Sequence, residues 1–274
     1  MVDGSLLEGV SATALWTLRS RALESRRPDR LLTDPWAEHL FDSIGFDYKV
    51  FGKPAQYHVL RAIAFDQYTR HFLRHHPKAV VVALAEGFQT SFWRLHPELE
   101  ATDGHWYSVD LDPVMASRER LLPPDDRLVN LATSALDRGW MTHVGDDRPI
   151  LITAEGLLMY LAPHDALNLI AECATRFPGG QFIFDSIPQR YSRQTLGGVK
   201  LSKDYTLPPM PFSLSAEQAR DLPDTVPGVR RVHTIPLPGG RGWWKLCGYR
   251  SLERFEPFRS MGPTVLTFDS PGHA

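Results

Sequence analysis

One segment of the chain constrains the fold more than any other: an unbroken apolar run of strand length from Ala79 to Leu84. A strand that is apolar on both sides is buried on both faces, as in the centre of a parallel sheet. The same rhythm continues downstream, with strand-like segments at 106–110, 127–132, 150–153 and 181–185, and helical patterns at 113–122, 136–144 and 163–177. This alternation predicts an α/β protein with a doubly wound, mostly parallel sheet.

The segments before and after this core differ from it in pattern. Helical spacing of apolar residues predicts helices over 5–26 and 55–76, with a short helix between them that opens at Asp34 and Pro35. Residues 187–226 mix prolines and glycines with charged residues and predict a long irregular segment, which is typical of a lid or a binding loop. Two short β-like runs, 229–236 and 264–268, predict a late antiparallel pair, and a helix is expected from Trp243 to Phe258 between them.

The 274 residues are expected to form one domain with four parts. These are an N-terminal helical cap (1–78), a cofactor-binding core (79–186), a lid and acceptor segment (187–228), and C-terminal strands with a helix (229–274).

Charge and composition exclude several classes of partner. Thirty basic and thirty-two acidic residues give a formal charge of −2, so the chain has no net positive field for nucleic acid or an anionic membrane. No apolar stretch reaches membrane-spanning length, and residues 1–4 lack signal-peptide character. Cys173 and Cys247 fit neither a disulfide framework nor a metal site. We therefore expect a cytoplasmic protein without nucleic acid or membrane partners; a monomer and a homodimer are equally open.

Three histidines, His71, His75 and His76, lie on one predicted helix, where an i,i+4 pair can bind zinc. No H-E-x-x-H arrangement accompanies them. We expect these side chains to be exposed and predict no metal site.

In a doubly wound sheet the ligand lies beyond the carboxyl ends of the strands, so the residues that follow each strand are the candidates for binding. Gly87 follows the first strand, where a glycine lets the backbone approach a ligand closely. Neither G-x-G-x-x-G nor G-x-x-x-x-G-K is present, which argues against a pyrophosphate loop. Asp110 closes the second strand, where a carboxylate can hold ribose hydroxyls. The carboxylate alone also fits NAD, but without the glycine fingerprint an adenosyl group that lacks a diphosphate is favoured.

Two later strand ends add candidates. Ser134 follows the third strand and can meet an adenine edge, although it can equally cap the next helix. Glu155 follows the fourth strand beside Gly156 and can bind a cationic group, act as a base or contact the ribose.

Taken together, these segments resemble the leucine carboxyl methyltransferase superfamily, and most closely its bacterial branch, the tetracenomycin polyketide synthesis O-methyltransferase-like proteins. The resemblance extends over nearly the whole chain and rests on the order and spacing of many short motifs. The motifs are 18–29 (L-R-S-R-A-L-E-S-R-R-P-D), 34–37 (D-P-W-A), 84–90 (L-A-E-G-F-Q-T), 92–95 (F-W-R-L), 109–111 (V-D-L), 118–123 (R-E-R-L-L-P), 134–137 (S-A-L-D), 154–160 (A-E-G-L-L-M-Y), 177–180 (F-P-G-G) and, in the lid, Ser192, Arg193, Thr195, Gly197, Lys203, Tyr205 and 208–211 (P-P-M-P).

The resemblance implies a class I methyltransferase with a Rossmann-like sheet, N-terminal helices, a lid after the fifth strand and an antiparallel last strand. Such an enzyme uses S-adenosylmethionine, releases S-adenosylhomocysteine and needs no metal. The resemblance further implies that Arg61 holds the methionine carboxylate, with Arg21 near it. The other residues implied in cofactor binding are Ala85, Glu86, Gly87, Asp110, Leu111, Ser134, Ala135, Leu136 and Glu155, and Glu155 and Tyr160 are implied as catalytic residues around the transferred methyl group.

The chain departs from the family pattern at two positions of the first loop. Ala85 stands where the family usually has glycine, and Gln89 stands where it often has an acidic residue. Alanine fits such a loop if its φ is negative.

For the acceptor, the resemblance implies a carboxylate or hydroxyl oxygen of a small, polyketide-like molecule. A carboxylate is ionised at neutral pH, whereas a phenol with a pKa of about 10 needs a base, for which Glu155, His58 and His233 are the candidates. Cationic and aromatic lid residues are expected to clamp the acceptor: Tyr191, Arg193, Lys203 and Tyr205, with Arg190 and Lys200 nearby. Six aromatic residues either line an apolar acceptor pocket or belong to the core: Tyr57, Phe65, Tyr68, Trp93, Trp243 and Trp244.

The sequence thus predicts an S-adenosylmethionine-dependent O-methyltransferase. Two alternatives use the same cofactor: a reaction other than methyl transfer, such as an intramolecular cyclisation, and a cofactor-binding protein with a decayed active site, which Ala85 and Gln89 would favour. An NAD oxidoreductase is disfavoured because the phosphate loop is absent.

Overall fold

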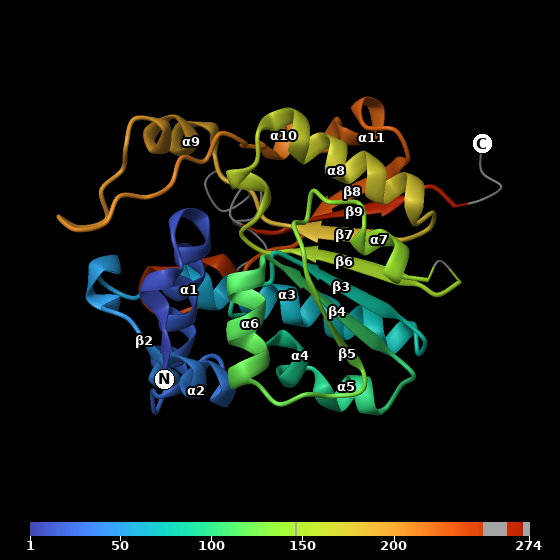
Figure 1. Ribbon diagram of the computed structural model, residues 1–274. Helices are drawn as coiled ribbons and strands as arrows, with labels where there is room; N and C mark the ends of the chain where they lie inside the picture. The colour runs from blue at the N-terminus through green and yellow to red at the C-terminus, as the bar shows by residue number, and fades with distance from the viewer. Residues whose placement is uncertain (146, 249–261, 271–274) are drawn as a thin grey trace.

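A seven-stranded sheet forms the centre of the computed structural model, which describes residues 1–145, 147–248 and 262–270 (Figure 1). Its strands are β3 (Val80–Leu84), β4 (His105–Asp110), β5 (Leu128–Ala132), β6 (Ile150–Ala154), β7 (Gln181–Phe184), β8 (Val229–Thr234) and β9 (Thr264–Phe268), in the spatial order β5-β4-β3-β6-β7-β9-β8. The first five run parallel, and β9 runs antiparallel to both β7 and β8. The predicted doubly wound sheet with a late antiparallel pair is confirmed.

The strand order fixes where a ligand belongs. β3 lies between β4 and β6, and all five of its residues are buried, as its apolar run predicts. The chain winds outward from β3 through β4 and β5 on one side, and through β6 and β7 on the other. The topological switch point therefore lies at the carboxyl ends of β3 and β6.

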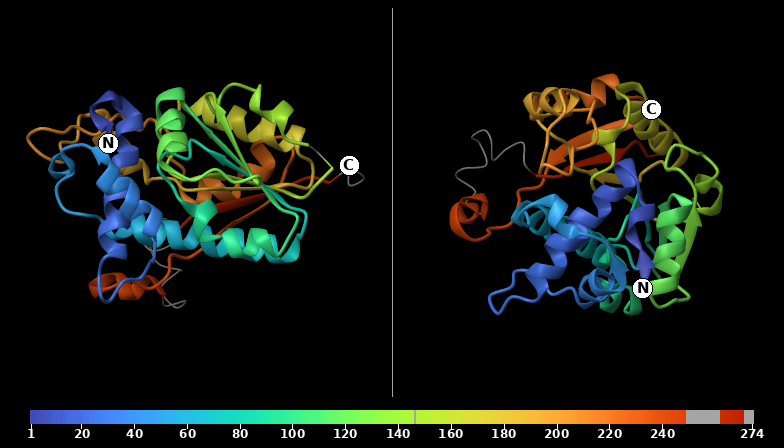
Figure 2. Two further views of the ribbon diagram at one scale, coloured as in Figure 1. Left: turned by 60° about the horizontal axis from the view of Figure 1, so that its bottom comes forward. Right: turned by 60° about the vertical axis from the view of Figure 1, so that its left-hand side comes forward.

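Helices cover both faces of the sheet, as Figure 2 shows. On one face, α3 (Gln56–His75), α4 (Ser91–Arg94) and α5 (His96–Glu100) pack side chains such as Phe92 against Val81 and Trp106 of the sheet. On the other face, α7 (Trp140–His143), α8 (Pro163–Arg176) and α11 (Leu222–Thr225) cover Val82 and its neighbours. Within the described ranges, no helix is long and apolar enough to span a membrane.

The N-terminal helices α1 (Gly9–Ser25) and α2 (Pro35–Ser43) lie beside α6 (Asp112–Leu121), next to the strand ends (Figure 1). Asp34 caps α2, since its carboxylate accepts a hydrogen bond from Ala37 N at 3.0 Å, and Pro35 occupies the first turn as predicted. The first helix starts later than predicted because a separate 3-10 turn, η1 (Gly4–Leu6), precedes it. Two short strands, β1 (Val2–Asp3) and β2 (Ile44–Gly45), pair in parallel, and η2 (Tyr48–Phe51) follows them.

Three segments differ from their predictions. The segment 187–226 is not irregular throughout, because it holds α9 (Gln189–Leu196), α10 (Ala216–Arg220) and α11. A capping box, in which Ser215 and Gln218 exchange hydrogen bonds, starts α10 despite the prolines around it. The helix predicted over 136–144 is shorter in the structure, where only α7 is helical. A turn precedes α7, in which the Asp137 carboxylate accepts a hydrogen bond from Gly139 N. The helix predicted from Trp243 to Phe258 is a 3-10 helix, η4 (Gly242–Gly248), and its later part lies outside the described residues.

Candidate active site

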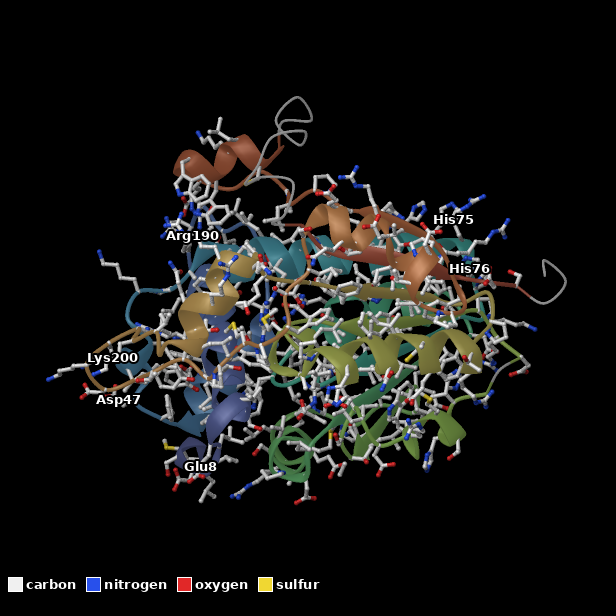
Figure 3. The ribbon with its side chains drawn as sticks, turned by 90° about the horizontal axis from the view of Figure 1, so that it is seen from above. Glu8, Asp47, His75, His76, Arg190 and Lys200 are labelled. Carbon is white, nitrogen blue, oxygen red and sulfur yellow. The ribbon has the colours of Figure 1, made fainter. Side chains whose placement is uncertain are left out.

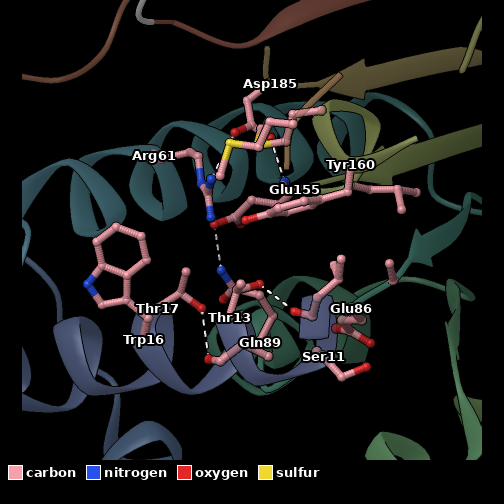
Figure 4. A pocket seen from close by; sticks show the side chains of 18 of the residues that line it. Ser11, Thr13, Trp16, Thr17, Arg61, Glu86, Gln89, Glu155, Tyr160 and Asp185 are labelled. Atoms are coloured by element: carbon pink, nitrogen blue, oxygen red, sulfur yellow. Dashed lines mark hydrogen bonds and ion pairs between the residues drawn. The ribbon is translucent and has the colours of Figure 1, made fainter. Parts of the chain in front are cut away.

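A cavity of about 680 Å³ lies at the carboxyl ends of the parallel strands. Its walls are the loops after β3, β4, β5, β6 and β7, together with α1, the start of α3 and the segment that includes α9. Figure 4 shows its polar centre, where Arg61, Glu155 and Gln89 face one another beside α1. A cavity of this size holds a small-molecule ligand.

Asp110 ends β4 at the wall of this cavity and is only 8% exposed. Its Oδ2 accepts a hydrogen bond from Gly87 N at 2.6 Å, and its Oδ1 accepts one from Leu111 N at 2.7 Å. Burial raises the pKa of Asp110, and these two backbone donors partly offset the rise. Because a carboxylate offers about four acceptor positions, about two remain for hydroxyl groups of a ligand.

The loop after β3 takes a left-handed conformation at two positions. Gly87 has a φ of +58°, and a Cβ there would lie 3.0 Å from the Cβ of Ala14 on α1. The absence of a side chain at Gly87 therefore allows the loop to pack closely against α1. Ala85 has a φ of +49°, so the negative φ that would suit alanine is not what the loop adopts. The carboxylate of Glu86 is held by Arg118, whose Nη2 lies 3.0 Å from Oε2.

Replacing Ala85 by glycine should stabilise the protein, because a residue with a side chain is disfavoured in the left-handed region and glycine is not. We expect the free energy of unfolding to rise by about 1 kcal/mol and Tm to rise by about 2–4 °C in thermal denaturation. The matched control is Gly87→Ala, which should lower Tm because it adds a Cβ at a φ of +58° against Ala14. A lower Tm for Ala85→Gly would show that this position is not strained.

Arg61 of α3 joins two acidic residues from different strand ends. Its Nε donates to Glu155 Oε1 at 2.9 Å, and its Nη1 donates to Asp185 Oδ2 at 2.8 Å. Gln89 Nε2 also donates to Glu155 Oε1, at 2.6 Å, and Gly156 N donates to Asp185 Oδ1 at 2.6 Å. Burial raises the pKa of Glu155, and the charge of Arg61 partly offsets the rise. The amide of Gln89 therefore stabilises the Glu155 carboxylate by a hydrogen bond, whereas an acidic residue at position 89 would repel it.

Two parts of the wall were not predicted from the sequence. Asp185 follows β7 as an acidic residue after a buried strand, which is the same signal that identifies Asp110, but only its ion pair with Arg61 shows its place in the site. The contribution of α1 was also missed, because no local pattern places an N-terminal helix over the strand ends. Its lining residues are Val10, Ser11, Thr13, Ala14, Trp16 and Thr17.

The cavity brings together most of the residues predicted to bind the cofactor or to act in catalysis. Those that line it are Arg61, Ala85, Glu86, Gly87, Asp110, Leu111, Ser134, Ala135, Leu136, Glu155 and, in η3 (Leu158–Tyr160), Tyr160. Leu111 and Leu136 are 47% and 40% exposed, so they leave apolar surface uncovered beside Asp110. Burial raises the pKa of Tyr160 to about 12, so its hydroxyl stays protonated.

Arg21 is placed differently from the prediction, since it is not among the described residues that line the cavity. Its guanidinium is fully buried behind the first loop, where it donates to Asp34 Oδ2 at 2.7 Å, Thr90 Oγ1 at 3.0 Å and Phe88 O at 2.6 Å. Arg94 Nη1 reaches the same Asp34 carboxylate at 2.6 Å. The structure thus gives Arg21 a part in fixing α1, α2 and the loop to one another.

Of the four lid residues predicted to clamp an acceptor, Tyr191 alone lines the cavity. Arg193 is exposed and donates to Gln189 on its own helix at 2.9 Å, and Lys203 is exposed as well. Tyr205 packs edge-on against Phe51, with ring centroids 4.8 Å apart. Figure 3 shows Lys200 at the outer edge of this segment and Arg190 also on the lid. The predicted cationic clamp is not assembled at the cavity, because these charged side chains are turned toward solvent.

Of the two histidines predicted as bases, His58 lines the cavity and His233 on β8 does not. His58 Nδ1 lies 3.1 Å from Ser20 Oγ. Burial and the neighbouring charges of Arg61 and Arg21 lower the pKa of His58 well below its ordinary value. Among the aromatic candidates, Tyr57 and Trp244 line the cavity, Phe65, Tyr68 and Trp93 pack against the core, and Trp243 stacks on Trp244 outside the lining.

The three histidines predicted on one helix do not line this cavity: His71 and His75 belong to α3, and His76 directly follows it and is half-buried, where exposure was expected. His71 and His75 are exposed, and Figure 3 shows His75 and His76 at the opposite end of the molecule from Lys200. In the part of the chain that the structure describes, no three potential metal ligands gather at one place.

Comparison with known proteins identifies the family to which the chain belongs. Residues 14–174 match the family model of leucine carboxyl methyltransferase. The chain is 32% identical over 228 residues to the tetracenomycin polyketide synthesis O-methyltransferase TcmP of Streptomyces glaucescens, which covers 82% of each chain. It is 29% identical over 265 residues to a putative S-adenosyl-L-methionine-dependent methyltransferase of Streptomyces coelicolor, covering 86% of this chain and 82% of the relative.

Two solved structures share the fold at low identity. A putative methyltransferase from Thermobifida fusca superposes with a TM-score of 0.54 at 16% identity, covering 92% of this chain and 94% of that one. The CurJ carbon methyltransferase superposes with a TM-score of 0.55 at 12% identity, covering 95% and 67% of the two chains. Because the family model spans more than half of the residues and a relative shares nearly a third of its aligned positions, the chain belongs to the leucine carboxyl methyltransferase family and is an S-adenosylmethionine-dependent methyltransferase.

Proposed function

We propose that the protein transfers a methyl group from S-adenosylmethionine to an oxygen atom of a small, largely apolar acceptor of polyketide type. The observation that carries the proposal is one continuous cavity with two kinds of wall. Its polar end is built on Asp110 and the first loop. Its apolar end is built on a cluster in which Trp16, Ile187 and Tyr191 pack around Met159 and Met210. A single cavity of this kind can hold a polar cofactor and an apolar second substrate next to each other.

The polar end has the chemistry that S-adenosylmethionine requires. Asp110 keeps acceptor positions for ribose hydroxyls, and the uncovered surfaces of Leu111 and Leu136 suit the flat faces of an adenine. Arg61 offers guanidinium hydrogens to the methionine carboxylate, and Glu155 supplies negative charge toward the ammonium and sulfonium groups. When bound, the cofactor would supply an activated methyl group on a sulfonium, and the leaving group would be the neutral thioether of S-adenosylhomocysteine.

The apolar end supports a planar, hydrophobic acceptor. Its walls carry Trp16, Met159, Ile187, Pro188, Tyr191 and Met210. Holding an acceptor oxygen in line with the methyl group can lower the activation barrier by about 7–11 kcal/mol. The main role of the apolar end is therefore to position the acceptor by the shape of its walls. The name of the Streptomyces glaucescens relative, which refers to tetracenomycin polyketide synthesis, supports a polyketide-like acceptor. An intramolecular reaction of the cofactor would not need this room.

Methyl transfer is tested by incubating the purified protein with S-adenosylmethionine and a panel of hydroxylated and carboxylated naphthalenes and anthraquinones. We expect mass spectrometry to find an acceptor that gains one methyl group on oxygen, together with an equal amount of S-adenosylhomocysteine. Methylation at carbon would refute transfer to oxygen. Consumption of the cofactor without any methylated acceptor would favour a reaction other than methyl transfer.

A further inference from the structure

Two acidic residues share one arginine at the carboxyl ends of β6 and β7. Arg61 donates from Nε to Glu155 Oε1 at 2.9 Å and from Nη1 to Asp185 Oδ2 at 2.8 Å (Figure 4). Neither carboxylate bonds Nη2, and Arg61 lines the cavity. Nη2 is therefore the nitrogen that can meet the methionine carboxylate of the cofactor, and its direction depends on what holds the rest of the guanidinium.

The two carboxylates differ in their relation to the cavity. Glu155 accepts the hydrogen bonds from Arg61 and Gln89 on Oε1, and no described residue bonds its Oε2. Asp185 is only 1% exposed, and both of its oxygens are bonded, Oδ2 to Arg61 and Oδ1 to Gly156 N at 2.6 Å. Glu155 can therefore contact a ligand directly, whereas Asp185 acts on a ligand through Arg61.

The sheet holds Asp185 in place. Ala154 of β6 is the register partner of Phe184 of β7, and the hydrogen bond from Gly156 N to Asp185 continues this pairing past the strand ends. Gly156 has a φ of +74°, and a Cβ there would lie 3.4 Å from both Nη1 and Nη2 of Arg61. Arg61 comes from a helix, but its guanidinium is thus fixed to two neighbouring strands through Asp185 and Glu155.

The electrostatics identify Asp185 as a main partner of Arg61. Burial alone would lower the pKa of Arg61, but the charges of Asp185 and Glu155 raise it above its ordinary value. The Arg61 side chain is 7% exposed, and a charge buried to this extent is costly without a partner. Since Glu155 can also contact a ligand, Asp185 is the partner of Arg61 for which a bound ligand does not compete.

We propose that Asp185 is a positioning residue for the cofactor, which holds Arg61 so that its Nη2 faces the methionine carboxylate. This inference rests on the proposed function, in which Arg61 binds that carboxylate. The adenosine part of the cofactor is assigned to other residues of the wall: Asp110, Leu111 and Leu136. Disturbing Asp185 should therefore weaken binding of the amino-acid part of the cofactor and leave binding of its adenosine part unchanged.

This difference is measured by calorimetric titration with two ligands. S-adenosylhomocysteine carries the amino-acid carboxylate, and 5′-methylthioadenosine has the same adenosine and sulfur without it. We expect Asp185→Asn to bind S-adenosylhomocysteine at least about tenfold more weakly, because a displaced Arg61 loses its hydrogen bond to the ligand carboxylate. Its affinity for 5′-methylthioadenosine should stay within about twofold. The control is Asp165→Asn on α8, outside the described lining: Asp165 pairs with His164 at 3.0 Å, and neither affinity should change.

A double-mutant cycle separates an action through Arg61 from an independent one. Arg61→Gln should itself weaken binding of S-adenosylhomocysteine, and adding Asp185→Asn to it should cause no further loss. A second variant, Asp185→Glu, keeps the negative charge and displaces the carboxylate by one methylene. It tests the position of the carboxylate without removing the buried charge, and it should also lower the preference for S-adenosylhomocysteine over 5′-methylthioadenosine.

The outcomes distinguish positioning from a general structural role. Equal losses of affinity for both ligands would show that Asp185 only maintains the fold of the site. Unchanged S-adenosylhomocysteine affinity in both Asp185 variants, or an equal further loss in the Arg61→Gln background, would also overturn the inference. An unmodified protein that does not bind S-adenosylhomocysteine would instead contradict the cofactor assignment within the proposed function, so the two failures are distinguishable.

Discussion

An Asp110→Ala variant will bind S-adenosylhomocysteine at least about 100-fold more weakly than the unmodified protein in a calorimetric titration. A hydrogen bond to a charged group contributes about 1.5–3 kcal/mol, and the variant loses two such bonds with the ribose hydroxyls. Part of the effect arises in the loop, because the carboxylate also accepts hydrogen bonds from Gly87 N and Leu111 N. A cooperative thermal transition confirms that the variant is folded.

The matched control for this experiment is Asp112→Ala. Asp112 lies two residues further on, is exposed at the start of α6 and is not part of the described cavity lining. Its replacement removes the same charge from the same segment, and should leave the affinity as it was. Equal affinities for the two variants would mean that Asp110 does not hold the cofactor.

An Asp34→Ala variant will lose about 3–5 kcal/mol of stability, because it leaves buried arginines without their partner. Asp34 and Arg21 are fully buried, and the Asp34 carboxylate also accepts hydrogen bonds from Arg94, Thr90 and Ala37 N. We expect Tm to fall by about 10 °C. Asp42→Ala is the control on the same helix: Asp42 is 63% exposed and pairs with Arg26, so its loss should cost less than about 1 kcal/mol.

The Asp34 carboxylate should also contribute to the loss of folding stability at low pH. Burial alone would raise the pKa of Asp34, but the charges of Arg94 and Arg21 and the hydrogen bond from Thr90 lower it to about 2. A carboxyl whose pKa is lower in the folded state stabilises the fold above its unfolded pKa of about 3.9, and this contribution is lost as the pH falls toward 2. Between pH 4 and pH 2, urea denaturation should show a loss of about 2 kcal/mol that Asp34→Ala does not show.

Features that depend on a local pattern and on the strand-end rule were predictable. The apolar run at 79–84 predicts the central strand β3, and alternation predicts the sheet around it. Once the strands are known, an acidic residue directly after one of them belongs at the ligand edge. Asp110 and Glu155 both lie there.

Features that depend on long-range packing were not predictable in the same way. The lid has the composition of a cationic clamp, but composition does not fix which side of α9 faces the cavity, and Arg193 faces solvent. The resemblance implied that Arg21 lies near the cofactor, yet its partners Asp34 and Thr90, 13 and 69 residues away in the sequence, draw it behind the loop. The φ of +49° at Ala85 was not predicted either, because alanine carries no local signal for the left-handed region.

The assignment of this cavity to S-adenosylmethionine is tested most directly by calorimetry. The unmodified protein is titrated with S-adenosylhomocysteine and, in a parallel experiment, with NAD. We expect one site with a dissociation constant in the micromolar range for S-adenosylhomocysteine, and no binding of NAD, because the chain has no pyrophosphate loop. Absence of S-adenosylhomocysteine binding, or binding of NAD at the same site, would contradict the assignment of this cavity to S-adenosylmethionine.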